Sequence, residues 1–168
     1  MGRWEPDARG RLEEAALELY VERGFENTTV AEIAARAGLT ERTFFRHYAD
    51  KREVLFAGST AFVELLARAV VDAPGSAPPL AAVGAALEAA GEVIQARGQR
   101  ARLRHKVIGA TAELRERELL KMASSASALA DGLRRRGVEA REASLVAEAG
   151  MAVFRVAFER WVQQPGQL

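Results

Sequence analysis

The 168-residue sequence contains no cysteine, which excludes disulfide frameworks, thiolate metal sites and cysteine nucleophiles. It contains two histidines, His47 and His105, and neither belongs to a cluster with the spacing of metal ligands. The sequence also lacks a glycine-rich phosphate loop, and no nucleophile has an evident base nearby. We therefore expect a protein that is not an enzyme and that holds no metal or other cofactor.

Charge of one sign and long apolar runs are scarce as well. The formal net charge is +1, so the overall charge does not indicate a nucleic-acid partner. We find no run of about 18 apolar residues that could span a bilayer. The N-terminus MGRWEPDARGR lacks the apolar stretch of a signal peptide. These absences predict a cytoplasmic protein with no membrane partner.

Residues that favour β-strands are scattered and rarely alternate with polar ones, whereas Ala, Leu, Glu and Arg dominate. This composition predicts an all-α fold. Apolar residues recur at helical spacing from Leu12 to Tyr20, and Gly24 follows as a stop signal. The first helix is therefore expected at about 7–23.

A short segment after this helix has the start and stop signals of a helix-turn-helix. Thr29 and Glu32 have the spacing of a capping box, which opens a very short helix that Gly38 stops. Thr40 is the next expected N-cap, so that a second short helix begins directly after a tight turn. Asp50 then precedes a longer helix, expected from residue 51 to residue 71.

The charges of the N-terminal segment are unevenly distributed. Residues 12–32 carry six glutamates against one arginine, whereas residues 36–52 carry five cations against Glu41 and Asp50. The positive charge is thus confined to the region of the predicted helix-turn-helix. Its five cations are Arg36, Arg42, Arg46, Lys51 and Arg52.

This geometry suits the reading of DNA. Phe44 and Tyr48 lie one turn apart and should face the core, so that their neighbours remain free to approach the major groove. Lys51 stands in the first turn of the next predicted helix, where a bound phosphate would offset its unfavourable position against the helix dipole. We assign to the DNA-binding surface Thr29, Thr40, Arg42, Thr43, Phe45, Arg46, His47 and Lys51.

The motifs RGF (23–25), TTVAEIA (28–34), AGLT (37–40), TFFRHY (43–48) and KREVL (51–55) closely resemble the N-terminal domain of the TetR family. The resemblance implies a dimeric repressor whose third helix reads the major groove and is moved when a small molecule enters the C-terminal domain. In that family the positions of Arg42, Thr43, Phe45, Arg46 and His47 contact bases or phosphates, and the position of Lys51 contacts phosphate. Tyrosine is common at the position of Phe45 and a basic residue at that of Ala31, which implies fewer backbone contacts here.

The sequence pattern of the rest of the chain predicts a helical bundle. The stretch 72–79 contains three prolines and marks a loop, and apolar stripes at helical spacing follow it. We expect a helix-turn-helix DNA-binding domain at 1–52, a linking helix from 51, and a helical ligand-binding and dimerisation domain at 53–168. Segments such as RLR (102–104), ATAELR (110–115) and EAGMAVFR (148–155) are similar to those of actinobacterial TetR regulators of acyl-CoA-like ligands, including mycofactocin-system regulators.

The abundance of apolar residues suggests a small apolar effector, and the resemblance implies one that is acyl-CoA-like. Its expected lining is Phe62, Leu66, Leu87, Met122, Phe154 and Phe158. Two interpretations of the basic run 97–106 remain open. It can meet the phosphates of such a ligand, or it can be a solvated helix face.

The last helix is apolar on more than one side, since only Glu148 and Arg155 are charged between residues 145 and 158. One side should pack on its own domain, and the other should pair with a second copy across a two-fold axis. Such a homodimer requires a palindromic DNA operator. The expected dimer stripe is Val146, Gly150, Val153, Ala157 and Trp161.

A second reading of the sequence is a ligand-independent architectural or protein-binding helical module. A preferred DNA site separates the two readings, because architectural binders have none.

Overall fold

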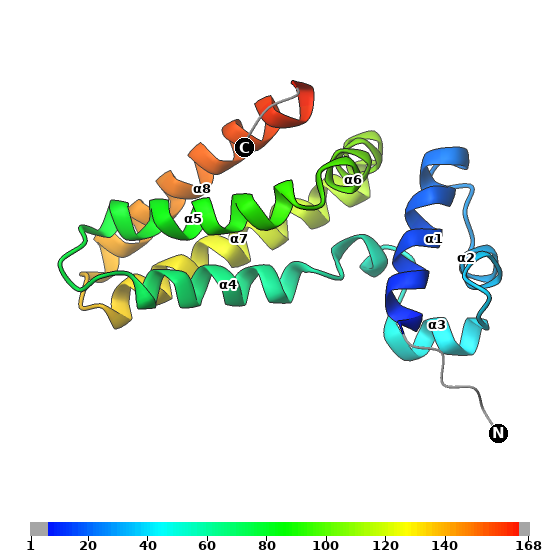
Figure 1. Cartoon of the computed structure of the whole chain (residues 1–168), viewed down its shortest axis with the longest axis horizontal. Helices are drawn as coiled ribbons and strands as arrows, with labels where there is room; N and C mark the ends of the chain where they lie inside the picture. The colour runs from blue at the N-terminus through cyan, green and yellow to red at the C-terminus, as the bar shows by residue number, and fades with distance from the viewer. Residues whose placement is uncertain (1–6, 165–168) are drawn as a thin grey trace. The chain divides into compact units, whose positions relative to one another are not determined.

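A computed structural model of the chain describes residues 7–164, which contain helices and no strand (Figure 1). The all-α prediction is thereby confirmed. The elements in chain order are α1 (Ala8–Arg23), α2 (Val30–Arg36), α3 (Glu41–His47), the 3₁₀-helix η1 (Glu53–Phe56), α4 (Ser59–Asp72), α5 (Pro79–Gln95), α6 (Gly98–Ala110), α7 (Ala112–Arg135) and α8 (Ala140–Gln163).

The chain divides into two compact units. The first contains the residues up to Gly58 together with Leu103–Leu114, and the second contains Ser59–Arg102 and the residues from Arg115 onward. The first unit therefore includes η1 and most of α6, which lie outside the domain range 1–52 that we expected for DNA binding. The physical reason is that Val54, Val107 and Ile108 are buried in the same apolar core as α1.

The core of the first unit is built where α1, α2 and α3 meet. Leu12, Ile33 and Phe44 come from these three helices, and none of them is exposed to solvent. Burial of the Phe44 ring orients α3, since Phe44 is the one buried residue of that seven-residue helix. Tyr48 is also buried, so the prediction that Phe44 and Tyr48 face the core is confirmed.

The turn between α2 and α3 is set by Gly38, whose φ of 66° lies in the left-handed region. The backbone N–H of Gly38 donates to Ala35 (3.0 Å) and that of Leu39 donates to Ala34 (2.8 Å). These two bonds form a Schellman motif, which satisfies the last carbonyls of α2. Thr40 then caps α3 by accepting from the backbone N–H of Thr43 at 3.2 Å. The helix-turn-helix predicted from the sequence is confirmed in this unit.

The prediction of a continuous helix from residue 51 is wrong at its start. Asp50 does act as a cap, because its Oδ1 accepts from the backbone N–H groups of Arg52 (2.8 Å) and Glu53 (3.1 Å). This cap opens only the short 3₁₀-helix η1, and α4 begins at Ser59, eight residues after the predicted start at residue 51. The chain turns at Ala57–Gly58 between the two. The sequence-based capping signal was correct, but it did not reveal the length of the element that follows.

The second unit is a bundle in which α4 and α5 run antiparallel (Figure 1). Small residues line the seam between α5 and α8, where Ala82, Ala86, Ala143 and Ala147 are buried. Gly150 lies on the same seam, and a Cβ atom added there would come within 2.5 Å of a methyl group of Val83. The small side chains therefore let the two helices approach closely and leave the seam filled.

One helical segment is more apolar than we expected from the sequence. Glu53–Asp72 spans 20 residues with a mean hydropathy of 1.7, which is long and apolar enough to cross a membrane by composition alone. The expectation that no such run exists is corrected by this finding. Core helices of globular domains pass the same test, and Leu66 and Val70 are fully buried in the apolar core of the second unit.

Candidate nucleic-acid interface

The outer face of α3 carries two arginines. Arg42 and Arg46 are both exposed, whereas Phe44 between them is fully buried. At about 100° per residue, Arg42 and Arg46 lie within about 40° of each other and opposite Phe44. Like charges one turn apart on a helix are unfavourable by about 0.2–0.5 kcal/mol, and an anion bound at both removes that cost. This pair is the centre of the candidate interface.

Most other cations of the first unit are engaged within the protein. In the part of this unit that the structure describes, Arg42, Arg46 and the α6 residue Lys106 are the arginines and lysines without a hydrogen-bond, ion-pair or cation–π partner. The engaged cations are Arg9, Arg11, Arg23, Arg36, Lys51, Arg52 and Arg104. Two of the three free cations therefore stand side by side on the helix that follows the turn.

Arg36 shows the contrast most clearly. It belongs to the basic segment identified in the sequence, yet its guanidinium bridges Glu18 (3.1 Å) and Glu22 (2.9 Å) of α1. The Glu22 and Glu18 carboxylates raise the pKa of Arg36 above its ordinary value, and the Arg36 hydrogen bond lowers the pKa of Glu22. The glutamate-rich stretch of α1 thus neutralises Arg36 and leaves α3 as the positive face.

The flanks of α3 carry the remaining predicted contacts of that helix. Phe45 is 55% exposed, and its ring packs edge-on against the buried ring of Phe44 at a centroid distance of 5.5 Å. On the other flank lie Thr43 and His47, and the Thr43 hydroxyl is 3.1 Å from that of Thr40. The structure therefore brings Arg42, Thr43, Phe45, Arg46 and His47 together on one short helix.

Thr29 and Thr40 lie at the N-termini of α2 and α3. The hydroxyl and backbone N–H of Thr29 both lie 2.9 Å from the Glu32 carboxylate, and the Thr29 hydroxyl accepts from the backbone N–H of Glu32, which completes the predicted capping box. These bonds to Thr29 lower the pKa of Glu32. Both threonines are exposed, so their contact with DNA stays a prediction, but their hydroxyls already serve as helix caps.

Lys51, which we assigned to the DNA-binding surface, is engaged within the protein, and its contact with phosphate stays a prediction. Its ammonium donates to the carbonyl oxygens of Phe25 (2.8 Å) and Thr28 (2.9 Å), and it also lies over the Phe25 ring. These contacts direct its donors at the turn between α1 and α2. Lys51 therefore holds that turn, a role that its place after the helix-turn-helix did not reveal.

A second polar network holds the C-terminal end of α3. The hydroxyl of Tyr48 donates to Glu13 of α1 (2.8 Å) and accepts from Arg9 (3.2 Å), and Arg9 also donates to the carbonyl of Ala57 at 2.7 Å. Burial and the bond to Glu13 raise the pKa of Tyr48 to about 12. This network is not visible in the sequence, because residues 39 positions apart meet only in the folded unit.

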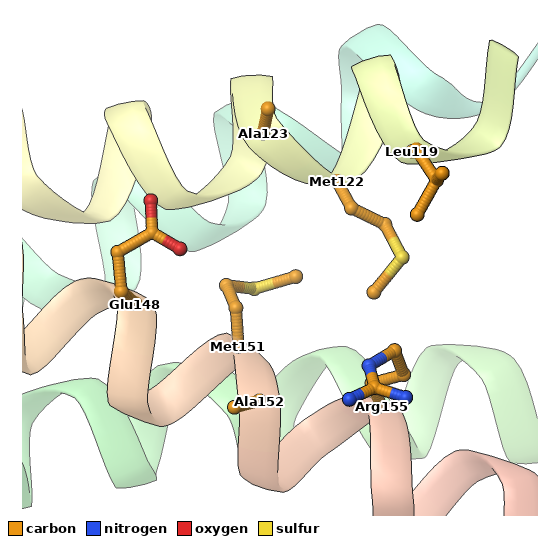
Figure 2. A pocket seen from close by; sticks show the side chains of 7 residues that line it. All are labelled: Leu119, Met122, Ala123, Glu148, Met151, Ala152 and Arg155. Atoms are coloured by element: carbon orange, nitrogen blue, oxygen red, sulfur yellow. The ribbon is translucent and has the colours of Figure 1, made fainter. Parts of the chain in front are cut away.

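The residues predicted to line an effector cavity form part of the core of the second unit. Leu66 is fully buried, while Phe62, Leu87, Met122 and Phe154 are half-buried against the same apolar cluster. The rings of Phe62 and Phe154 lie 6.0 Å apart, and Phe158 packs on Trp161 at 5.7 Å. Of these residues, Met122 lines a groove of about 250 Å³ between α7 and α8 (Figure 2).

The predicted dimer stripe does not form one exposed face. Gly150 and Trp161 are buried inside the second unit and Val146 is half-buried, whereas Val153 is 69% exposed and Ala157 is exposed. Gly150 and Trp161 share a face with the buried Ala143 and Ala147, and Val153 lies about 60–80° around the helix from Gly150 and Trp161. The exposed apolar residues of α8 lie on another face and include Leu145, Val153 and Val156.

The basic run 97–106 is only in part a solvated helix face. The Arg102 guanidinium lies 4.3 Å from the centre of the Trp161 ring in the second unit. In the first unit, Arg104 donates to the carbonyl of Leu55 (2.6 Å) and lies over the Phe56 ring. Two of its cations thus contribute to packing, a use that neither interpretation of the sequence contained.

Comparison with known proteins gives relatives of one kind. TcmR, an HTH-type transcriptional regulator from Streptomyces glaucescens, is 40% identical over 81 residues, which are 48% of this chain and 36% of TcmR. The putative mycofactocin biosynthesis transcriptional regulator MftR from Mycobacterium tuberculosis is 35% identical over 54 residues, 32% of this chain and 27% of MftR. The matches therefore span only about a third of the length of these curated relatives.

Solved structures share the fold. SmeT, described as the repressor of the Stenotrophomonas maltophilia multidrug efflux pump SmeDEF, matches in its complex with triclosan. The TM-score is 0.68 and the identity 22%, and the match covers 94% of this chain and 81% of SmeT.

Two family models match the sequence itself. Residues 12–57 match the bacterial regulatory proteins of the tetR family, and residues 77–168 match the MftR C-terminal domain. The chain belongs to the TetR family of bacterial transcriptional regulators, with a C-terminal domain of the MftR type.

Proposed function

We propose that the protein is a cytoplasmic repressor that binds a palindromic operator as a homodimer and is released from it by a small apolar effector. The observation that carries the DNA-binding part is the pair of unpartnered arginines, Arg42 and Arg46, on the exposed face of α3. The guanidinium fork of arginine matches the O6 and N7 acceptors of guanine and also binds phosphate. The role as a repressor is supported by the description of SmeT.

The proposed homodimer uses the outer face of α8 and not the stripe expected from the sequence. Leu145, Val153 and Val156 are exposed there, together with Ala149, at spacings of three and four residues. An exposed apolar stripe of this kind is typical of a surface covered by another chain. Pairing of two copies across a two-fold axis would place the two α3 helices on half-sites about 34–36 Å apart or a multiple of it.

The interface is tested by sedimentation of two matched variants. Val153→Glu places a charge at the centre of the α8 face and should convert the dimer into a monomer. Val93→Glu, on the exposed side of α5, should leave the oligomeric state unchanged. A wild-type monomer at micromolar concentration, or a dimer that persists in Val153→Glu, contradicts this part of the proposal.

DNA binding is tested by selection of bound sequences from a random pool, followed by footprinting of the enriched site. We expect one palindromic motif and an affinity that falls steeply with salt. Enrichment without any motif would favour the architectural reading, and no enrichment would favour a protein-binding module. Mapping of bound genomic DNA then identifies the regulated genes.

A further inference from the structure

The groove between α7 and α8 is apolar at its floor and carries one unpartnered charge. Met151 of α8 is buried and forms the floor, and Figure 2 shows its side chain and that of Met122 pointing into the space between the two helices. Leu119, which is 63% exposed, extends the apolar wall. Thioether and alkyl groups of this kind adapt to ligands of varied shape.

Glu148 lies between two neighbouring hollows. It lines the groove of about 250 Å³, and it also lines a second hollow of about 210 Å³ between the same helices. Within the described residues its carboxylate has no hydrogen-bond or ion-pair partner, and Figure 2 shows the carboxylate projecting toward α7. A ligand that fills either hollow therefore meets this negative charge.

The cations that line the two hollows are already compensated. Arg155, in the first hollow, pairs with Glu159 at 3.2 Å, and Arg134, in the second, pairs with Asp131. Counted together with Glu159 and Asp131, which lie outside the lining, these side chains carry one excess negative charge, that of Glu148. Acyl-CoA, the effector class suggested by the sequence, carries phosphates that this charge would repel.

We infer that the α7–α8 groove binds a lipophilic monocation, with its apolar body against Met122 and Met151 and its positive charge beside Glu148. This inference rests on the proposed function, because it names the chemical class of the effector. The groove borders the exposed stripe proposed for the dimer, because Ala152 lies about 20° around α8 from Leu145 and Glu148 about 60° from it. At about 100° per residue, Glu148 lies about 140° around the helix from Val153.

The experiment compares three probes that share a ten-carbon chain and differ in the head group: decyltrimethylammonium, decanol and decanoate. Binding to the full chain is measured by titration calorimetry below the micellar concentration, in the absence of DNA. We expect saturable binding of the cation, about two- to fivefold weaker binding of decanol, and weaker binding still of decanoate, since a charge pair at a solvent-accessible site contributes modestly.

Three variants assign the binding to the groove. Glu148→Gln should remove the preference for the cation over decanol, whereas Glu92→Gln, an exposed carboxylate on α5, should keep it. Ala152→Phe fills the groove from an exposed position and should weaken all three probes without changing the helical circular dichroism. Decanoate binding as tightly as the cation, or a cation preference that survives in Glu148→Gln, overturns the inference.

Absence of binding by every probe also overturns it. In that case, a change of oligomeric state in Ala152→Phe would show that a second copy covers the groove. The DNA measurements are independent of these results. A chain that binds an operator but no probe refutes only the inference, whereas one that binds the cation but no DNA refutes the proposed function.

Discussion

The Nζ of Lys51 lies 4.3 Å from the centre of the Phe25 ring and donates to the Phe25 carbonyl oxygen at 2.8 Å. One ammonium thus combines a cation–π contact with hydrogen bonds to a turn that is 23–26 residues away in the sequence. The carbonyls of Phe25 and Thr28 lie beyond the end of α1, and the Phe25 carbonyl also accepts from the backbone N–H of Thr28 at 3.3 Å. Lys51 therefore connects the segment before η1 to the turn between α1 and α2.

Replacement of Lys51 by methionine should lower the free energy of unfolding by about 2 kcal/mol, because hydrogen bonds to a charged group are lost and the carbonyls stay partly buried. The measurement is the urea midpoint of the full chain. Lys106→Met is the control, since Lys106 is an exposed residue of the same unit. An unchanged midpoint in Lys51→Met, together with weaker DNA binding, would return Lys51 to the phosphate-contact role.

Arg42→Ala and Arg46→Ala should each reduce operator affinity and flatten its dependence on salt. A lost phosphate contact lowers the slope of log K against log salt by about one, and a lost base contact costs about 1–3 kcal/mol and relaxes the sequence preference. Fluorescence anisotropy at several salt concentrations separates the two effects. Arg36→Ala, which removes an arginine already paired with Glu18 and Glu22, should leave the slope nearly unchanged.

Gly150→Ala should destabilise the second unit by about 1–3 kcal/mol, because the added Cβ atom would lie 2.5 Å from the Val83 methyl group in a filled seam. The matched control is Gly84→Ala on α5, where nothing lies within 4 Å of the new Cβ. That change should stabilise by about 0.5–1 kcal/mol through the helix propensity of alanine. Thermal unfolding measures the change in stability of both variants. Equal changes in the same direction would refute the close approach of α5 and α8.

Arg136→Ala should lower the free energy of unfolding by about 2–3 kcal/mol. The guanidinium donates to the carbonyl of Val70 (3.3 Å) in the last turn of α4 and to those of Ala73 and Pro74 (2.8 Å), which follow the helix. The neighbouring Arg135 is exposed, and Arg135→Ala should change stability by less than about 0.5 kcal/mol. Chemical denaturation of the two variants tests the difference, and similar losses would argue against a specific role for Arg136.

Both tyrosines of the chain should ionise above their ordinary pKa of 10, because burial disfavours the phenolate of Tyr20 and Tyr48. The unfolded chain releases these protons near pH 10 and the folded chain only at higher pH. Stability should therefore be unaffected by these groups below about pH 10 and fall as the pH rises toward 12. Tyrosinate absorbance should rise near pH 12 for Tyr48, and Tyr48→Phe should remove that step. A full tyrosinate signal at pH 10.5 in the folded protein would contradict the burial.

Local features of the sequence were enough to place the DNA-reading element. The capping box of Thr29 and Glu32, the stop at Gly38 and the cap at Thr40 all involve residues within a few positions of one another, so their chemistry is visible in the sequence. The same proximity explains why the exposed residues of α3 could be chosen in advance. With Phe44 assigned to the core, the helical repeat dictates which neighbours face outward.

Contacts between distant segments were decided only by the tertiary structure. Lys51 has the spacing of a phosphate ligand in the sequence, but the fold brings its ammonium to the carbonyls of the Phe25–Thr28 turn. In α8, both faces look apolar, and only the packing of Val83 against Gly150 shows which face is internal. Amino-acid types and local spacing therefore determined the helices and their caps, whereas the pairing of faces depended on how closely distant helices approach each other.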